Sequence, residues 1–466
     1  MNAKAIRSML YFIPLLLAST LQPISTAASP ATPATHVRHA PNMQWWRQAR
    51  FGMFIHWGLY ALPAGVWQGK HVPGIGEWIM NNAHIPRQQY AKLASHFDPV
   101  NFSASTWVHI AKAAGMKYIV ITAMHHDGFC MFPTKATHYN IMDATPWHKD
   151  PLAALDKACH RQGLRFCTYY SVENWHSRYQ LPKSWNHGHP AYFPTRFAVG
   201  GAAPYLKYMT TQLGELIRHY HPAVIWFDNS VITPWKTPSG RQVSGWTQAD
   251  AQTIWNFVCK NDPSVIINNR LDKWSHFKGY GDYHTPEQQI PSQGISTPWE
   301  TCMTINSTWG YVSWNHDWKS SATLIHHLIH CASGGGNFLL NVGPTAQGVI
   351  PAPEVIRLRA IGQWLKINGQ AIYGSHRSPF NKPLPFGYAT QKSGKLFLEV
   401  THWPKNNRIL VPIHNAIVRA YLLAKPAIPL KTASLKSGAI VHLPATAADM
   451  IAPVVVLDIA GPIKPN

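Results

Sequence analysis

Apolar residues follow two different patterns along the chain. Between about residues 45 and 375, short runs of consecutive apolar residues alternate with longer segments in which apolar residues recur at a helical period. The short runs are typical of strands buried on both faces of a parallel sheet, and the longer segments predict helices. The predicted strands span residues 51–55, 118–123, 165–170, 224–227, 264–267, 299–304 and 337–342. The predicted helices span residues 105–114, 151–161, 204–220, 248–260, 322–332 and 353–367.

This order of elements predicts an α/β fold. Parallel strands joined by helical crossovers over this length are typical of a TIM-like (β/α)8-type barrel. No eighth strand is evident, so we expect the barrel to be irregular. Beyond residue 375 the pattern changes to short strands at residues 396–403, 408–413, 418–423, 438–443 and 454–459, separated by Pro, Gly, Lys and Asn. Such spacing without a helical period predicts a C-terminal antiparallel β-sandwich.

The first residues have the pattern of a secretory signal peptide. Lys4 and Arg7 precede an apolar run over residues 9–21, and the small residues Ser25 to Ala28 follow it. The run is too short to span a membrane, so we expect it to be cleaved, leaving no membrane span in the mature chain. The expected organisation is a signal peptide over 1–28, a catalytic barrel over 29–375 and a sandwich over 376–466. The expected location is periplasmic or extracellular.

The charge balance narrows the class of partner. The chain carries 41 Lys and Arg against 20 Asp and Glu, a formal net charge of +21. These basic residues are dispersed and form no run of five or more, which disfavours nucleic acid as a partner. The six cysteines include no CxxC pair, so they do not indicate a metal site, and a disulfide framework is not required in a chain of this length. A homo-oligomer stays compatible with the sequence.

Polar and aromatic side chains gather where the predicted strands end. The run Ala223 to Phe227 ends abruptly at Asp228, which would lie at the carboxyl end of a buried strand. In α/β barrels this edge carries the active site, although an Asp there can also cap the next helix. Other strands end in the same way, at His56, Trp57, His125, His126, Asp127, Tyr169, Tyr170, Glu173 and Arg270, and the segment from Trp299 carries Glu300. Together they predict a pocket for a polar, ring-shaped ligand.

Few acidic residues are placed to act in such a pocket. Excluding those in predicted helices and in the C-terminal region, the candidates at strand ends or in the following loops are Glu77, Asp127, Glu173, Asp228, Asp282, Glu287 and Glu300. An enzyme that works with paired carboxylates must draw on this set. His125 and His126 suggest a metal site as an alternative. Adjacent residues of a strand point to opposite faces, which disfavours that alternative, and we expect no metal or cofactor.

Four segments resemble the signature stretches of the α-L-fucosidases of glycoside hydrolase family 29. They are Trp46 to Gly58 (WRQARFGMFIHWG), Met124 to Phe129 (MHHDGF), Trp226 to Asp228 (WFD) and Gly336 to Pro344 (GNFLLNVGP). Their order and spacing agree over roughly residues 40 to 375. The resemblance implies a barrel followed by a β-domain, and two-step retaining hydrolysis of terminal α-L-fucose from fucosylated glycans.

The resemblance also implies roles for individual residues. Asp228 matches the nucleophile of the family. Glu287 is the favoured acid/base, with Glu300 and Asp282 as alternatives, and separation of the carboxyl groups must decide among them, since retaining sites keep them about 5 to 5.5 Å apart. Residues that match positions holding the sugar are His56, Glu77, Trp78, His125, His126, Tyr169 or Tyr170, Trp226 and Arg270.

Two other functions stay open on sequence grounds. One is a glycan-binding protein built on a catalytically idle barrel. The other is a retaining glycosidase for a related sugar such as α-L-galactose, which differs from L-fucose by one hydroxyl group on C6. The linkage preference depends on loops such as residues 70–76 and 231–242, which carry no readable signal.

Overall fold

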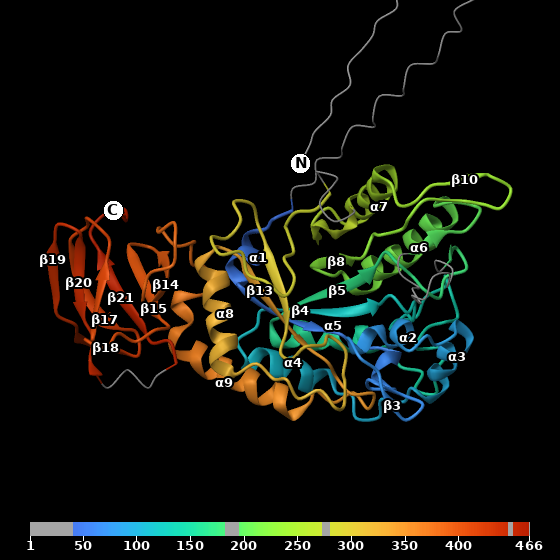
Figure 1. Ribbon diagram of the computed structural model, residues 1–466, viewed down its shortest axis with the longest axis horizontal. Coiled ribbons are helices and arrows are strands. Elements are labelled where there is room, and N and C mark those ends of the chain that lie inside the picture. Colours follow the sequence, from blue (N-terminus) through green and yellow to red (C-terminus); the bar gives the residue numbers. More distant parts are fainter. Residues whose placement is uncertain (1–40, 182–194, 273–279, 446–450, 466) are drawn as a thin grey trace, which may run out of the picture. The chain divides into compact units, whose positions relative to one another are not determined.

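The computed structural model describes residues 41–181, 195–272, 280–445 and 451–465. The predicted signal peptide, residues 1–28, lies outside the described residues. Seven parallel strands form one curved sheet in the order β11-β8-β5-β4-β1-β13-β12 (Figure 1). Their bounds are β1 (Phe51–Ile55), β4 (Tyr118–Met124), β5 (Arg165–Ser171), β8 (Val224–Asp228), β11 (Ile266–Ile267), β12 (Glu300–Thr304) and β13 (Asn337–Val342). All seven predicted strands are therefore present, and the TIM-like α/β architecture is confirmed.

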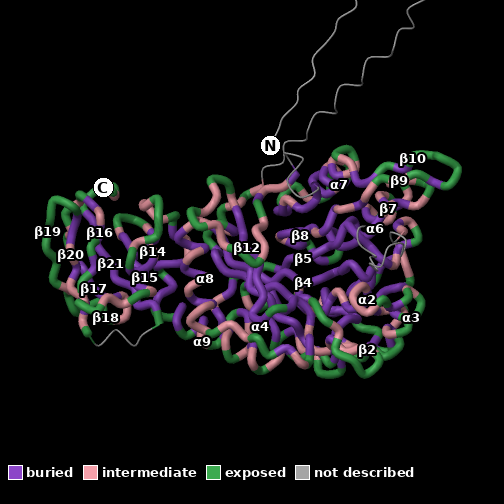
Figure 2. The backbone as a smooth tube through the Cα atoms, in the orientation of Figure 1, coloured by how far each residue is buried: buried purple, intermediate pink, exposed green. Residues whose placement is uncertain are grey.

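The strands are buried along nearly their whole length, as the apolar runs predict. Every residue of β1, β4, β12 and β13 is buried, and the sheet forms the buried centre of this part of the chain (Figure 2). Parallel strands covered on both faces lose the alternation of polar and apolar residues, which explains why their sequences read as continuous apolar runs.

An irregular segment takes the eighth position of the barrel. Isolated parallel bridges join Tyr283 to Asn268, just after β11, and join Glu287 to Cys302 of β12. The backbone N–H of Cys302 donates to Pro286 O at 3.1 Å. This segment contains a proline and several polar residues in place of an apolar run, so it forms bridges instead of a continuous strand. It nevertheless connects the two edge strands, and it carries Glu287 towards the carboxyl ends of the strands.

Helices connect the strands of the barrel. They are α4 (Ala104–Ala113), α5 (Pro151–Gln162), α6 (Ala203–Tyr220), α7 (Gln248–Asn261), α8 (Ser321–Ser333) and α9 (Ala352–Asn368). Several begin at a side chain that accepts a backbone N–H, including Ser103, Asp150 and Ser320, and α7 begins with a capping box of Thr247 and Asp250. The helix α5 ends at Gly163, whose φ of 76° suits glycine. These local signals explain why the helix bounds predicted from the sequence agree with the observed bounds within two residues.

Short elements occupy the loops around the barrel. The short helices are α1 (Gln44–Ala49), α2 (Ile79–Asn82), α3 (Arg87–Ala91), η1 (Leu59–Ala61), η2 (Gly76–Trp78), η3 (Lys92–His96), η4 (Asn269–Leu271) and η6 (Gly369–Ala371). The two-residue strands are β2 (Val66–Trp67) with β3 (Lys70–His71), β6 (Gln180–Leu181) with β7 (Arg196–Phe197), and β9 (Trp235–Lys236) with β10 (Gln242–Val243). They contain too few residues to show a period, and the sequence did not predict them.

Antiparallel sheets follow the barrel, as predicted. A five-stranded sheet has the order β14-β15-β21-β17-β18 and a three-stranded sheet the order β16-β20-β19. The strands are β14 (Gly387–Lys392), β15 (Lys395–Val400), β16 (Arg408–Val411), β17 (Ile417–Leu422), β18 (Lys425–Pro429), β19 (Thr432–Leu435), β20 (Gly438–His442) and β21 (Val454–Ile459). Apolar residues of both sheets, such as Leu398 and Val441, belong to one buried cluster. The sequence did not predict β14, β18 or β19, and the last two are fully exposed and show no apolar alternation.

Within the described residues, no helix combines the length and apolar character needed to cross a bilayer.

Candidate active site

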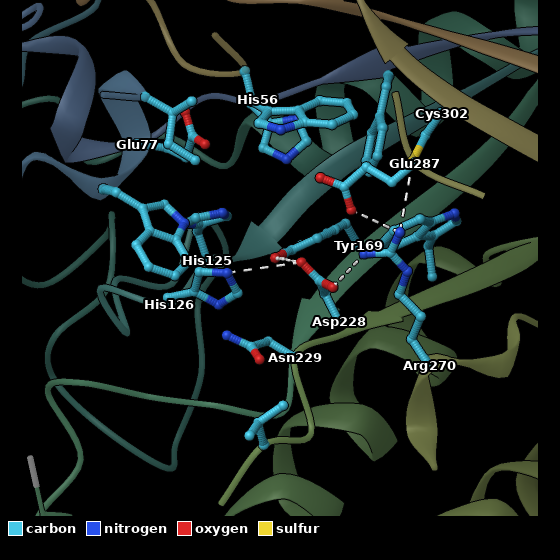
Figure 3. A pocket seen from close by; sticks show the side chains of 16 residues that line it. His56, Glu77, His125, His126, Tyr169, Asp228, Asn229, Arg270, Glu287 and Cys302 are labelled. Atoms are coloured by element: carbon cyan, nitrogen blue, oxygen red, sulfur yellow. Dashed lines mark hydrogen bonds and ion pairs between the residues drawn. The ribbon is translucent and has the colours of Figure 1, made fainter. Parts of the chain in front are cut away.

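A cavity of about 330 Å³ opens at the carboxyl ends of the barrel strands (Figure 3). Aromatic rings form much of its wall, and Asp228, Arg270 and Glu287 gather on one side, across from Glu77 (Figure 3). The lining residues are Phe54, His56, Ile75, Glu77, Trp78, His125, His126, Tyr169, Trp226, Asp228, Asn229, Val231, Arg270, Glu287, Cys302 and Trp309. This location agrees with the position of active sites in α/β barrels.

Asp228 projects into this cavity from the last position of β8. Its Oδ1 lies 2.8 Å from Nη1 of Arg270, and its Oδ2 accepts a hydrogen bond of 2.9 Å from the hydroxyl of Tyr169. The Nε2 atom of His126 lies 3.7 Å from the same Oδ2. Burial raises the pKa of Asp228, but the charge and hydrogen bond of Arg270, together with His126 and the hydroxyl of Tyr169, outweigh burial and hold that pKa below its usual value. Asp228 is therefore an ionised carboxylate, as a nucleophile requires.

Glu287 and Asp228 form ion pairs with the same arginine, Arg270. Nη2 of Arg270 lies 2.8 Å from Oε2 of Glu287, while Nη1 holds Asp228 (Figure 3). The guanidinium is itself held by Thr285 Oγ1 at 2.8 Å and lies over the ring of Trp226, 4.5 Å from its centroid. The Glu287 side chain is 32% exposed, against 16% for Asp228, so Glu287 lies nearer to the opening of the cavity. The arrangement provides one deep and one outer carboxyl group.

The two alternative acids lie elsewhere. Glu300 is the first residue of β12, at the end of the strand opposite the cavity, and is completely buried in contact with Tyr118 and Trp226. The assignment of Glu300 to the site was wrong because strands of a parallel barrel run in one direction, so a residue that begins a strand cannot reach the edge where strands end. Asp282 is also outside the cavity, where its Oδ2 accepts a hydrogen bond of 2.8 Å from the N–H of Ile267.

Three histidines line one side of the cavity, and all three are neutral. Burial lowers the pKa of His56 to about 3 and that of His126 to about 4, and it holds the pKa of His125 well below its usual value. Nδ1 of His56 lies 2.7 Å from Oδ1 of Asn341, and Nδ1 of His126 lies 2.6 Å from Oγ of Ser171. Neutral imidazoles can both donate and accept hydrogen bonds, which suits the hydroxyl groups of a sugar.

His125 and His126 do not point to opposite faces, contrary to our expectation from sequence. The strand β4 ends at Met124, so both residues lie beyond it, and both rings line the cavity with centroids 4.1 Å apart. In the described part of the chain, no three His, Cys, Asp or Glu side chains meet in a group suited to a metal ion.

The remaining predicted residues of the sugar pocket are present, with one exception. Glu77 is buried and accepts a hydrogen bond of 2.8 Å from the N–H of Gly310, and burial raises its pKa to about 7. Trp78 and Trp226 contribute indole rings to the cavity wall.

The exception is Tyr170, which lies outside the cavity. Its hydroxyl donates to Oε1 of Gln212 on α6 at 2.6 Å. Its neighbour Tyr169 lines the cavity, because successive side chains of a strand point to opposite faces. The sequence named both tyrosines, and the structure selects Tyr169.

Several lining residues were not predicted from the sequence, namely Phe54, Ile75, Asn229, Val231, Cys302 and Trp309. Asn229 was detectable, because it directly follows Asp228. Trp309 belongs to the loop after β12 and was detectable as an aromatic residue beyond a strand end. Ile75 and Val231 are isolated apolar residues in loops and carry no local signal.

Comparison with known proteins agrees with this geometry. The profile of the alpha-L-fucosidase family matches residues 18–370. The plasma alpha-L-fucosidase of Rattus norvegicus is 31% identical over 94% of this chain and 95% of its own length, and that of Homo sapiens is 30% identical over 90% and 89%.

The solved structures that are similar to this chain are also alpha-L-fucosidases. Alpha-L-fucosidase isoenzyme 1 from Paenibacillus thiaminolyticus superposes with a TM-score of 0.76 at 32% identity, covering 90% of this chain and 99% of its own. A trapped covalent intermediate of a GH29 alpha-L-fucosidase from Bacteroides thetaiotaomicron, in complex with 2-fluoro-fucosyl fluoride, superposes with a TM-score of 0.77 at 28% identity, covering 91% and 97%. The chain therefore belongs to the α-L-fucosidase family, glycoside hydrolase family 29.

Proposed function

We propose that this α-L-fucosidase is an exo-acting, retaining enzyme that removes terminal α-L-fucose by double displacement. Asp228 acts as the nucleophile and Glu287 as the general acid/base. The observation that carries the proposal is the shared guanidinium of Arg270, which lies 2.8 Å from a carboxylate oxygen of each residue. One arginine can hold both only if the two carboxyl groups flank the same small space, as a glycosidase that works with paired carboxylates requires.

The first step forms a covalent intermediate. An oxygen of Asp228 attacks the anomeric carbon of fucose while the glycosidic bond breaks, and Glu287 donates a proton to the departing oxygen. The product is a fucosyl ester of Asp228 with inverted configuration. In the second step Glu287 takes a proton from water, which attacks the same carbon and releases Asp228, so the overall configuration is retained. A covalent intermediate trapped in the Bacteroides thetaiotaomicron relative supports this route.

The size and walls of the cavity support exo action on a deoxysugar. A volume of about 330 Å³ is at the small end of ligand pockets and suits a single sugar ring. Neutral histidines on one side offer partners for hydroxyl groups. Phe54, Trp226 and Trp309 offer apolar surface for the ring and its methyl group. The substrate is therefore a fucosylated oligosaccharide or glycoconjugate.

Hydrolysis of 4-nitrophenyl α-L-fucoside, followed by NMR of the first product, tests this proposal. We expect release of 4-nitrophenol and initial formation of α-L-fucose, the retained anomer. Initial formation of the β anomer would contradict the double displacement, and sugar binding without turnover would show an idle barrel. Faster hydrolysis of the matching α-L-galactoside would instead indicate a glycosidase for the related sugar.

Replacing Arg270 with methionine is expected to move the acid limb of the pH profile of kcat/KM towards higher pH. The reaction needs Asp228 ionised, and the positive charge of Arg270 is the largest of the contributions that lower the pKa of Asp228 against the effect of burial. Without that charge, burial raises the pKa, so Asp228 takes up a proton at a higher pH and activity is lost there as pH falls. Rates measured from pH 3 to 8 test this expectation. An acid limb in the wild-type position would show that Arg270 does not control the charge of Asp228.

We further propose that the chain is exported, with residues 1–28 removed as a signal peptide, and that residues 376–466 form a separate sandwich domain. Lys4, Arg7 and the apolar run that follows support the first statement, and the change of pattern after residue 375 supports the second. Mass spectrometry of the protein secreted by its host would locate the mature N-terminus.

A further inference from the structure

Glu173 is a completely buried carboxyl group that lies beside the catalytic cavity without lining it. It follows the carboxyl end of β5. Both of its oxygens accept hydrogen bonds, Oε1 from the backbone N–H of Thr195 at 2.8 Å and Oε2 from Nδ2 of Asn229 at 2.6 Å. The proposed mechanism does not use Glu173, so its position next to the residue that follows Asp228 needs an explanation.

Asn229 connects this carboxyl group to the cavity. It directly follows Asp228, it lines the cavity, and its φ of 51° places it in the left-handed region that asparagine tolerates. Since Nδ2 is bound to Glu173, the amide is oriented with Oδ1 on the other side. Among the described residues, Oδ1 of Asn229 receives no hydrogen bond. It is therefore available as an acceptor in the cavity wall.

We propose that Glu173 is a positioning residue, which orients the amide of Asn229 so that Oδ1 accepts a hydrogen bond from a hydroxyl group of the bound fucoside. This inference rests on the proposed function, since it assigns a further contact to the same substrate. Each carboxyl oxygen of Glu173 accepts a hydrogen bond from the N–H group that faces it, so Oε2 selects the NH2 side of the neighbouring amide. A side chain without an acceptor at the position of Oε2 would leave both orientations of the Asn229 amide available.

The burial of Glu173 supports a function beyond packing. Burial raises the pKa of Glu173 to about 8, and the hydrogen bond from the Thr195 N–H opposes this rise. Burying a carboxyl group away from water lowers the stability of the folded protein unless hydrogen bonds compensate. A connection between Thr195 and Asn229 that served only stability could be made by a neutral amide. The requirement for two acceptors explains why a carboxyl group stands at this position.

The exchange Glu173→Gln keeps the shape of the side chain and removes one acceptor. If Oε1 of the glutamine keeps the N–H of Thr195, its NH2 group faces Nδ2 of Asn229, and two donors then oppose each other. Rotation of the Asn229 amide relieves this conflict, because Oδ1 then accepts from the glutamine. The cavity wall presents a donor in place of an acceptor, and the hydrogen bond to the substrate is lost.

A double-mutant cycle on hydrolysis of 4-nitrophenyl α-L-fucoside tests the proposal. We expect Glu173→Gln and Asn229→Gly each to raise KM about 2- to 10-fold, the effect of one neutral hydrogen bond, and to leave kcat within about threefold. Glycine is chosen because it adopts the left-handed backbone without strain. In the Asn229→Gly background, Glu173→Gln should raise KM no further, because Glu173 acts only through the amide that is already absent.

A matched control separates positioning from structure. Tyr170→Phe, on the same strand but outside the cavity, should leave KM unchanged, and thermal unfolding reports the stability of each variant. An unchanged KM in Asn229→Gly overturns the proposal, even if Glu173→Gln fails to fold. Equal effects of Glu173→Gln with and without Asn229 also overturn it. An inactive wild-type protein would contradict the proposed function itself, whereas an active wild type with either of those two results contradicts only this inference.

Discussion

The exchange Asp228→Asn is expected to lower kcat for 4-nitrophenyl α-L-fucoside by roughly 10³- to 10⁵-fold, the loss typical of removing a catalytic nucleophile. The amide cannot form the fucosyl ester, although it fills the same space and can still contact Tyr169. Affinity for fucose and the unfolding temperature should change little, since Arg270 keeps Glu287 as a partner. Steady-state rates, binding calorimetry and thermal unfolding measure these three quantities.

Trapping of the intermediate sharpens this experiment. A 2-fluoro-fucosyl fluoride should label the wild-type protein on a peptide that contains Asp228, and it should leave the Asp228→Asn variant unlabelled. Tyr169→Phe serves as the matched control, because it removes one hydrogen bond to Asp228 and keeps the ring in the cavity wall. We expect that control to lose no more than about 10-fold in kcat and to keep the label. A label on any other residue would exclude Asp228 as the nucleophile.

The exchange Glu287→Gln is expected to lower kcat/KM by an amount that depends on the leaving group of the substrate. Removing a general acid typically costs about 10²- to 10⁴-fold, and the loss is largest where the departing oxygen needs a proton. Hydrolysis of a fucosylated disaccharide should therefore fall by that amount, while hydrolysis of 2,4-dinitrophenyl α-L-fucoside should lose far less in its first step. Comparing kcat/KM for the two substrates measures the difference.

Rescue of activity by azide distinguishes Glu287 from Glu300 and Asp282 as the acid/base. Without a general base, water attacks the fucosyl ester slowly, whereas azide needs no deprotonation and should yield α-L-fucosyl azide from the Glu287→Gln variant. The controls are Glu300→Gln and Asp282→Asn, whose carboxyl groups lie outside the cavity and should give no azide product. Azide rescue of the Glu300 variant in place of the Glu287 variant would contradict the assignment and would require a different arrangement of β12.

The sequence by itself determined the barrel, the antiparallel sheets and the place of Asp228. Strands buried on both faces must consist of apolar residues, so each central strand appears as an apolar run, and helices carry caps that mark their ends. Asp228 ends such a run, and a single direction of the strands places every strand end at one edge. His56, Trp226 and Arg270 lie at the site for the same reason, because each belongs to a strand or lies within three residues of the end of one.

Only the tertiary structure decided which acid faces Asp228. Glu287 belongs to an irregular segment that shows no strand pattern, and it enters the site because that segment bridges Asn268 and Cys302 on the two edges of the sheet. The choice of Tyr169 over Tyr170 depended on the face of β5 that meets the cavity, which a run of buried residues does not reveal. Arg270 joins carboxylates that lie 42 and 17 positions away along the chain, in opposite directions. Contacts over such separations arise from closure of the barrel, and no local pattern of residues encodes them.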